Sequence, residues 1–517
     1  MIHKHRKVNE IMRKISLIVI SVSILLLTVL LTAFMFSLFS CGDSGKNEAR
    51  ADDNKEDTTN PESDGNAAET PAYAEDDLGA HDFGGYVFNI WSCQMDVFYG
   101  NLDVEEETGD VLDDSIYKRN RKIEERFNFT FKELAQDIGA IGWSFDKPKK
   151  TILAGEYAYD IINIFVPHAY QWAQEGLVHP VKSLPYVDLD KPYWHQELNR
   201  ELSVANKMYF ASGEFNLTAY DCTQALLFNK SLAQDLGIAD LYTLVLDGKW
   251  TFEKFAEYCL DARKDLDGDG KMTVEDQHGY ISTSRMVLPN FWMAAGVKTI
   301  YKDADDIPYF AAMEQRFVDA YDMAMTYVRH NDAWFKAPSP NVQNDPLLTN
   351  MFKNGRALFF DNNFYTIKYL RDMDIDFGIL PYPKMNEQQD RYYTRLYWTE
   401  LFCVPVIADD AALLRTSVIL ESLSCESAKY VIPAYYDISL KTKMARDVES
   451  EAMLDILFNT RVFDFGDNVW NGTLRDGRFT DLFERGTTDL ISAMEKIEKT
   501  VQKDIDKLVD AFKALEY

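Results

Sequence analysis

A loop at residues 265–276 carries side chains with the types and spacing of a calcium site. Asp265, Asp267 and Asp269 alternate along it, and Gly270 follows where a sharp turn is needed. Ca²⁺ takes about six to eight oxygen ligands, and alternate Asp side chains on a tight loop converge on one point. The pattern predicts a structural Ca²⁺ that pins the end of the preceding helix. Its ligands would come from Asp265, Asp267, Asp269, Lys271, Thr273 and Asp276.

The end of this loop departs from the usual pattern. Lys271 would contribute its backbone carbonyl, and Thr273 its hydroxyl or a bound water. Asp276 stands where a longer Glu usually binds the ion with both carboxylate oxygens. The shorter Asp side chain weakens the expected binding of the ion at this end of the loop. A solvated acidic turn is therefore the alternative interpretation. The loop has no second copy in the chain, which argues against a calcium sensor and against a cellulosomal docking module.

Cys41 is the second residue whose context predicts chemistry. Basic residues precede a largely apolar run from Ile15 to Phe39, and the small Ser40 follows it, as in an export signal. A Cys directly after the small residue resembles a bacterial lipobox, in which the thiol takes a diacylglycerol and becomes the mature N-terminus. We therefore predict that residues 1–41 are a lipoprotein signal peptide and that Cys41 anchors the protein on the extracellular face of the cell membrane. An uncleaved anchor is the alternative, since about 20 apolar residues span a bilayer.

The segment after Cys41 predicts a spacer rather than a fold. Residues 42–82 are rich in acidic and small polar side chains, so they cannot bury enough apolar surface to order and should form a disordered acidic tether. The formal charge of −29 argues against a nucleic-acid partner. Five further cysteines are widely spaced and form no CxxC pair, which predicts buried free thiols: Cys93, Cys222, Cys259, Cys403 and Cys425.

Strands alternate with helices from Tyr86 onward, which predicts α/β architecture. Apolar, β-branched and aromatic runs give strands at 86–91, 128–133, 159–165, 225–228, 356–361 and 399–406. Apolar residues at helical spacing give helices at 112–127, 314–329, 409–423 and 488–515. Another helix opens after Thr251, which is a suitable N-cap.

Several segments, in a fixed order, carry a family resemblance. They are the lipobox, the acidic tether, the helix from Ile116 to Phe127, "YDIINIF…AQEGLVHPV" at 159–181, "ALLFNKSLAQDLGI" at 225–238 and "GKWTFEKFAEY" at 248–258. This series resembles the extracellular solute-binding lipoproteins of ABC importers, in the group related to maltodextrin-binding proteins. The resemblance implies a type II periplasmic-binding-protein-like fold, with two lobes, each a central sheet flanked by helices, and a ligand cleft between them. It also implies a non-enzymatic protein that captures a small solute, a sugar or oligosaccharide, and delivers it to a permease.

The same resemblance sets the expected domain boundaries. The first lobe comprises residues 84–219 and about 357–408, and the second comprises about 220–356 and 409–517. Crossovers between the lobes are expected near Thr218–Thr223, Arg356–Asp361 and Trp398–Val406, where they would act as the hinge.

Ligand-binding positions are predicted at the carboxyl ends of strands and at the crossovers. Aromatic faces stack on sugar rings, and carboxylates and amides pair with hydroxyls. The predicted residues are Trp91, Asp96, Phe165, His168, Tyr170, Trp172, Tyr220, Asp221, Asn362, Asn363, Phe364, Tyr365, Trp398 and Glu400. The resemblance implies that positions following Phe165 and Phe360 commonly face ligand.

Two alternatives from other functional classes stay open at this point. One is a secreted glycoside hydrolase, which needs two carboxylates about 5–10 Å apart across a cleft. Asp and Glu are too abundant in this chain for their presence to decide, but no GxSxG, HExxH, phosphate-loop or dinucleotide motif is found. The other is a calcium-stabilised surface-binding protein, which the absence of internal repeats argues against.

Overall fold

The computed structural model describes residues 73–94, 101–137, 145–238, 240–336, 346–370, 373, 376–441 and 448–515, which belong to one compact unit. The predicted signal peptide with Cys41, most of the predicted tether, and Asp96 lie outside the described residues. Within the described part, no helix is both long and apolar enough to cross a bilayer.

The first sheet forms the core of one lobe. Its strand order is β12-β3-β1-β2, with β1 parallel to both neighbours and β12 antiparallel to β3. Every residue of β3 is buried, as expected of a strand covered on both faces. The strands are β1 (Tyr86–Gln94), β2 (Phe129–Asp137), β3 (Ile161–Phe165) and β12 (Glu400–Cys403). The helices of this region are α2 (Val111–Phe127), α4 (Asp146–Leu153), α5 (Val166–Gln174), η1 (Val181–Ser183) and α6 (Gln196–Leu202).

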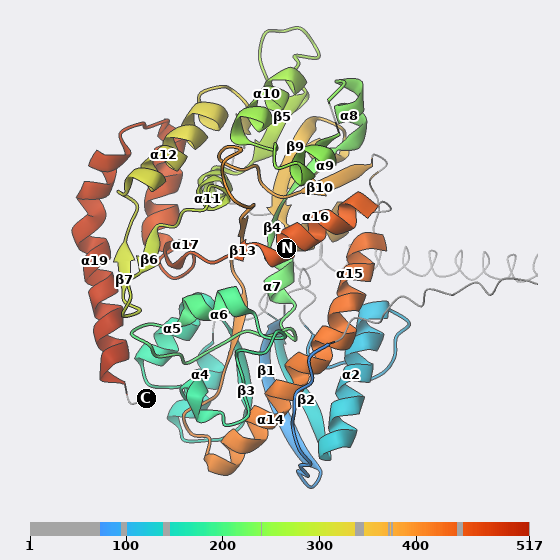
Figure 1. The fold of residues 1–517 in the computed structure, drawn as a ribbon, viewed down its shortest axis with the longest axis vertical. Coiled ribbons are helices and arrows are strands. Elements are labelled where there is room, and N and C mark those ends of the chain that lie inside the picture. Colours follow the sequence, from blue (N-terminus) through green and yellow to red (C-terminus); the bar gives the residue numbers. More distant parts are fainter. Residues whose placement is uncertain are drawn as a thin grey trace, which may run out of the picture. The chain divides into compact units, whose positions relative to one another are not determined.

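The second sheet forms the core of the other lobe (Figure 1). Its order is β10-β4-β9-β5-β8, in which β4 runs antiparallel to β10 and β9, while β5 runs parallel to β9 and β8. The strands are β4 (Gln224–Asn229), β5 (His278–Ser282), β8 (Trp334–Lys336), β9 (Ala357–Asn363) and β10 (Phe377–Leu380). The intervening helices are α8 (Lys230–Asp235), α9 (Leu241–Leu246), α10 (Phe252–Ala262), α11 (Ser284–Ala294), α12 (Gln315–Ala324), η2 (Met325–Arg329), α13 (Pro346–Lys353) and η3 (Phe364–Leu370). The predicted N-cap is confirmed, since Thr251 accepts a hydrogen bond from the Lys254 amide at 3.4 Å.

The predicted boundary near residue 357 is wrong. β9 and β10 pair with β4 in the second sheet, so the chain does not return to the first lobe at Arg356–Asp361. It returns later, through residues 381–399 into β12. The helix α14 (Asp410–Glu426), assigned to the second lobe, instead buries its apolar face with β1, β2 and β12 of the first. Both errors arise because the apolar pattern of an element does not specify which sheet it joins.

Three crossovers connect the lobes. The first is α7 (Thr218–Asp221), as predicted, and the second runs through β11 (Thr394–Arg395) to Glu400. Of the predicted crossover at Trp398–Val406, only Trp398–Glu400 belongs to this second connection, and from Glu400 the chain stays in the first lobe until a third crossover. It leaves through η4 (Ser427–Val431) and α15 (Ile432–Lys441), which contact α2, and α16 (Val448–Asn459), which contacts β10. Short β13 (Arg461–Val462) then pairs with β11.

The C-terminal helix contacts both lobes. α19 (Leu490–Ala514) packs on α5 of the first lobe and on α12 and β7 of the second (Figure 1). Near its end Phe512 is fully buried, with its ring 5.5 Å from that of Tyr209 and 6.0 Å from that of Tyr170. The elements not yet named are β6 (Ile300–Lys302), β7 (Pro308–Phe310), α17 (Phe465–Asn468), η5 (Gly472–Phe479) and α18 (Thr480–Arg485).

The predicted thiol state is confirmed for the described cysteines. Cys93, Cys222, Cys259, Cys403 and Cys425 are free and buried. Burial raises the pKa of each thiol, so these cysteines act as small apolar core residues rather than nucleophiles.

Candidate functional site between the lobes

The second crossover lies directly against the first. Leu396 forms a β-bridge with Thr223, and the Tyr397 amide donates to the Cys222 carbonyl at 3.4 Å. The Cys222 thiol in turn donates to the Trp398 carbonyl at 3.1 Å. Two segments far apart in sequence therefore form one hydrogen-bonded connection between the lobes.

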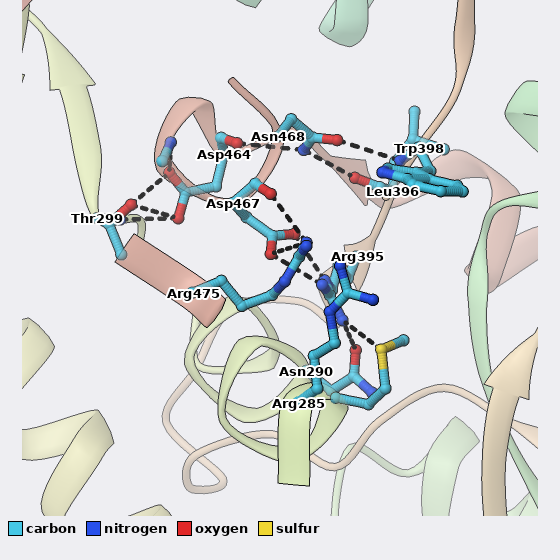
Figure 2. Close-up of polar contacts among 12 residues, drawn as sticks. Arg285, Asn290, Thr299, Arg395, Leu396, Trp398, Asp464, Asp467, Asn468 and Arg475 are labelled. Carbon is cyan, nitrogen blue, oxygen red and sulfur yellow. Dashed lines mark hydrogen bonds and ion pairs between the residues drawn. The ribbon is translucent and has the colours of Figure 1, made fainter. Parts of the chain in front are cut away.

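A fully buried ion network fixes the second crossover from the side of α17 and η5. Asp467 accepts hydrogen bonds from Arg395 at 2.7 and 2.8 Å and from Arg475 at 3.1 Å, and none of these side chains is exposed (Figure 2). The two guanidinium groups lie 4.5 and 4.4 Å from the centre of the Tyr397 ring. Charged pairs in such a dry setting hold their geometry because an unpaired charge there is costly.

Trp398 is the partly exposed aromatic side chain of this segment. The Asn468 side chain accepts from the Trp398 amide at 3.1 Å and donates to the Leu396 carbonyl at 3.3 Å (Figure 2). These bonds hold Trp398 in the left-handed region, at φ +71°. Its ring stacks on Tyr397 at 5.7 Å and lies 5.9 Å from Phe165 at the end of β3. An indole is thereby presented at the junction of the lobes.

A set of buried polar atoms comes from both lobes and from the second crossover. They have no hydrogen-bond partner within the described part of the chain and belong to residues that are nine-tenths or more buried: Trp91, Gln224, Thr283, Ser284, Tyr397 and Glu400. Trp91 and Glu400 come from the first sheet, Tyr397 from the crossover, and Gln224 begins β4. Thr283 and Ser284 follow the carboxyl end of β5. Because an unsatisfied buried polar group costs about 1–3 kcal/mol, such a set is suited to binding a ligand rich in hydrogen-bonding groups.

Glu400 has the most perturbed electrostatics of this set. Burial, followed by the charges of Glu133 and Asp221, raises its pKa to about 8. Its Oε1 is buried and unpartnered within the described residues. The group can therefore hold a proton at neutral pH.

The structure brings only part of the predicted ligand-binding set together. Glu400 lies opposite Phe165 in the strand pairing, Trp398 adjoins Phe165, and Asp221 is close enough to act on Glu400. His168 is half-buried beside Phe145, with ring centres 4.7 Å apart, and burial lowers its pKa. Trp91 is buried in β1 with its indole N–H unpartnered.

The other predicted residues lie in packed surroundings. The Tyr170 hydroxyl donates to the Leu202 carbonyl at 2.7 Å, and the Tyr220 hydroxyl donates to Glu214. Phe364 packs on Phe458, with ring centres 4.9 Å apart. The remaining members, all buried, are Trp172, Asn362, Asn363 and Tyr365.

The sequence prediction did not include Gln224, Thr283, Ser284 or Tyr397. The rule of carboxyl strand ends finds Thr283 and Ser284 once β5 is recognised, because they follow it directly. Gln224 stands at the amino end of an antiparallel strand, where the rule does not apply. Tyr397 is adjacent to the predicted Trp398.

The predicted calcium loop has three converging carboxylates. Oxygens of Asp265, Asp267 and Asp269 lie within 4.8 Å of one another. Asp276 instead accepts hydrogen bonds from the Leu266 amide at 2.8 Å and the Thr273 amide at 2.7 Å. Its carboxylate thus fastens the two ends of the loop, and three Asp residues remain as the core of a possible ion site.

A cavity of about 170 Å³ lies beside α6 and β13, with Leu396 of the second crossover in its wall, and none of the predicted ligand residues lines it. His195 in its wall contacts Ser212 through Nδ1 at 2.9 Å, and its Nε2 lies 3.5 Å from a Glu214 oxygen. Arg461 forms another wall and donates to the Phe458 and Ala219 carbonyls. The wall of this cavity carries both acidic and basic side chains, which specify no ligand class. The set of buried polar groups described above is therefore the stronger candidate for the ligand site.

Comparison with known proteins supports the architecture. Residues 123–417 match the sequence profile of the bacterial extracellular solute-binding proteins. A cyclo/maltodextrin-binding protein solved with maltotetraose has 11% identity and a TM-score of 0.52, covering 85% of this chain and 100% of that chain. An ABC substrate-binding protein from Listeria monocytogenes, solved with cycloalternan, has 13% identity and a TM-score of 0.51, covering 82% and 99%. UgpB from Mycobacterium tuberculosis, solved with glycerophosphocholine, has 14% identity and a TM-score of 0.50, covering 83% and 99%. None of the curated protein sequences is a significant match. These likenesses confirm the predicted two-lobe α/β fold.

Proposed function

Because this chain belongs to the bacterial extracellular solute-binding protein family, we propose that it captures a sugar or oligosaccharide between its lobes and delivers it unchanged to the permease of an ABC importer. The observation that carries this proposal is the set of buried polar groups without a partner among the described residues, which belong to the sheets of both lobes and to the crossover that carries Trp398. The family consists of extracellular binding proteins rather than enzymes, so the glycoside hydrolase alternative is dropped. Lipid anchoring through Cys41 is part of the proposal.

The chemistry of the junction favours a carbohydrate. A hydroxyl both donates and accepts, which suits a mixture of an indole N–H, a phenol, two hydroxyls, an amide and a carboxyl. The exposed part of the Trp398 ring offers an apolar face of the kind that stacks on sugar C–H groups. Two solved neighbours hold maltotetraose and cycloalternan, which supports the same ligand class here.

The arrangement of the crossovers fits capture by lobe closure. The first two crossovers form one bonded connection, so a small rotation there would move the polar groups of one lobe relative to those of the other. Closure would bring Thr283 and Ser284 toward Glu400 and Trp91. A ligand that bonds to both sets would stabilise the closed state.

The test is a thermal-shift screen of the purified protein against neutral mono- and oligosaccharides. A ligand that binds only the folded state raises the melting temperature. We expect at least one sugar to do so, to compact the protein in small-angle scattering, and to be recovered intact.

Substitution of Trp398 then tests where the ligand binds. Trp398→Ala should weaken binding by about 1–3 kcal/mol if the ring stacks on the sugar. Tyr309→Ala, on the exposed hairpin of β7, is the control and should leave affinity unchanged. Equal affinities for the two variants would place the ligand elsewhere, and hydrolysis of a bound sugar would overturn the transport function.

A further inference from the structure

Glu400 is a carboxyl group without a partner at the junction of the lobes. Its backbone is fixed by the first crossover, since its amide donates to the Thr218 hydroxyl at 3.0 Å and its carbonyl accepts from Asn216. Its side chain is 2% exposed, and Oε1 is buried with no hydrogen-bond partner among the described residues. The backbone of Glu400 is thus held in place, while its carboxyl group is available to bind a ligand.

The ionisable groups that act on Glu400 are acidic. Glu133 faces it from β2 and Asp221 from α7, and the thiols of Cys93 and Cys222 are close enough for Glu400 to raise their pKa. The buried Arg119 on α2 acts on Glu133, but it bonds to the Leu102 carbonyl, Asn120 and Ser427. Within the described part of the chain, no cation therefore acts on Glu400 to offset its charge.

Burial raises the pKa of Glu133, and hydrogen bonds to its carboxylate oppose that rise. Glu133 accepts from the Ser92 hydroxyl and from the Leu102 and Asp103 amides at 2.9 and 3.0 Å. Asp221 accepts from the Tyr435 hydroxyl at 2.8 Å. Hydrogen bonds to a carboxylate favour its charged form, and a third charge beside two others is disfavoured. Among the described residues Glu133 and Asp221 receive such bonds, whereas Oε1 of Glu400 receives none, so Glu400 is the carboxyl of the three whose charged form is least stabilised by hydrogen bonds.

We infer that Glu400 enters the solute site as a neutral carboxylic acid, donates a hydrogen bond to an uncharged oxygen of the solute, and selects neutral sugars over acidic ones. This inference rests on the proposed function. The charges of Glu133 and Asp221 repel an anionic sugar, whereas the O–H of Glu400 satisfies a hydroxyl or ether oxygen. The shift of its pKa to about 8 agrees with a proton held at neutral pH.

The consequence is a characteristic pH profile of binding. Below about pH 7 the proton is in place and affinity should be constant. As pH rises through about 8 the proton is lost, and affinity should fall toward tenfold per pH unit, since one proton is required for binding. An amide keeps a donor at this position without titrating, so Glu400→Gln should flatten the profile.

The binding experiment measures dissociation constants from pH 6 to pH 10 for maltotetraose, cellotetraose, xylotetraose and trigalacturonate. The wild type should bind at least one of the three neutral tetrasaccharides, with an affinity that is constant below about pH 7 and falls as the pH rises through about 8. It should bind that sugar more tightly than trigalacturonate. The matched control is Glu421→Gln, because Glu421 is equally buried but bonded to Tyr193, Trp194 and the Asp188 amide. That variant should keep the wild-type profile. A flat wild-type profile, or a preference for trigalacturonate, would overturn the inference.

A second measurement needs no ligand. In the infrared difference between wild type and Glu400→Gln at pH 7, the wild type should show the C=O stretch of one protonated carboxyl, and this band should vanish between about pH 8 and pH 9. Absence of the band means that Glu400 is charged and contradicts the inference whatever the sugar data. If the band is present but no sugar binds at any pH, the proposed function fails together with the binding role of Glu400.

Discussion

Removal of Asp467 should destabilise the connection between the lobes, because this fully buried carboxylate neutralises two buried arginines there. Asp467 is the only carboxylate within the described residues that bonds to Arg395, and it shares Arg475 with Asp476. Asp467→Ala leaves two buried guanidinium groups short of a charge partner. Breaking a fully buried ion pair from one side costs about 3–5 kcal/mol, and we expect a loss of unfolding free energy in that range.

Urea unfolding followed by tryptophan fluorescence measures this effect. The control is Asp481→Asn, because Asp481 pairs with Arg485 on the surface of α18, with side chains 39% and 72% exposed. A surface pair at that spacing contributes about 0.3–0.5 kcal/mol, so the control should differ little from the wild type. A loss below about 1 kcal/mol for Asp467→Ala would show that the network does not hold the crossover, and the reasoning about its rigidity would be refuted.

Three further predictions concern separate parts of the chain. Phe512→Ala should lower the unfolding free energy by about 3–5 kcal/mol, because a fully buried aromatic that packs on Tyr170 and Tyr209 is lost, and an unchanged urea midpoint would contradict that packing. EDTA should lower the melting temperature and Ca²⁺ restore it, and Asp267→Ala should abolish this response; a melt insensitive to EDTA leaves the acidic turn as the interpretation. Cys41→Ala should abolish membrane retention in a cell-fractionation assay, and retention equal to wild type would exclude the lipid anchor.

The sequence predicted the long elements well because their patterns are local. The helix at 112–127, the strand at 86–91 and the final helix at 488–515 all carry regular apolar spacing and all form. The sheet that each strand joins could not be predicted in the same way. β9 reads as a buried strand in the sequence, but its partners Leu226 and Tyr280 are distant in the chain, so its place in the second sheet could not be read from its own residues.

Two of the candidate residues that the sequence prediction did not include, Thr283 and Ser284, were missed because the strand before them was not predicted. β5 contains Gly279, a residue that weakens a strand pattern. The structure needs that glycine, because a Cβ there would lie 2.1 Å from the carbonyl oxygen of Cys259 on α10. Close packing of α10 on β5 therefore requires a glycine that weakens the sequence pattern of β5. For this reason the strand that Thr283 and Ser284 follow was not predicted. The candidate residues on the first lobe could be proposed from the sequence because their strands are rich in apolar and aromatic side chains.

In the proposed function, ligand contact and lobe movement would depend on the same peptide segment. Trp398 adopts φ +71°, a conformation that is unfavourable for a bulky residue by about 1–3 kcal/mol and persists only where the surroundings enforce it. The bonds that enforce it come from Asn468 on one side and the Cys222 thiol on the other, so they link the second crossover to α17 and to the first crossover. A rotation between the lobes must change at least one of these bonds and with it the direction of the indole. A sugar stacked on Trp398 would therefore favour one hinge angle over others, which is the differential affinity that closure on a ligand requires.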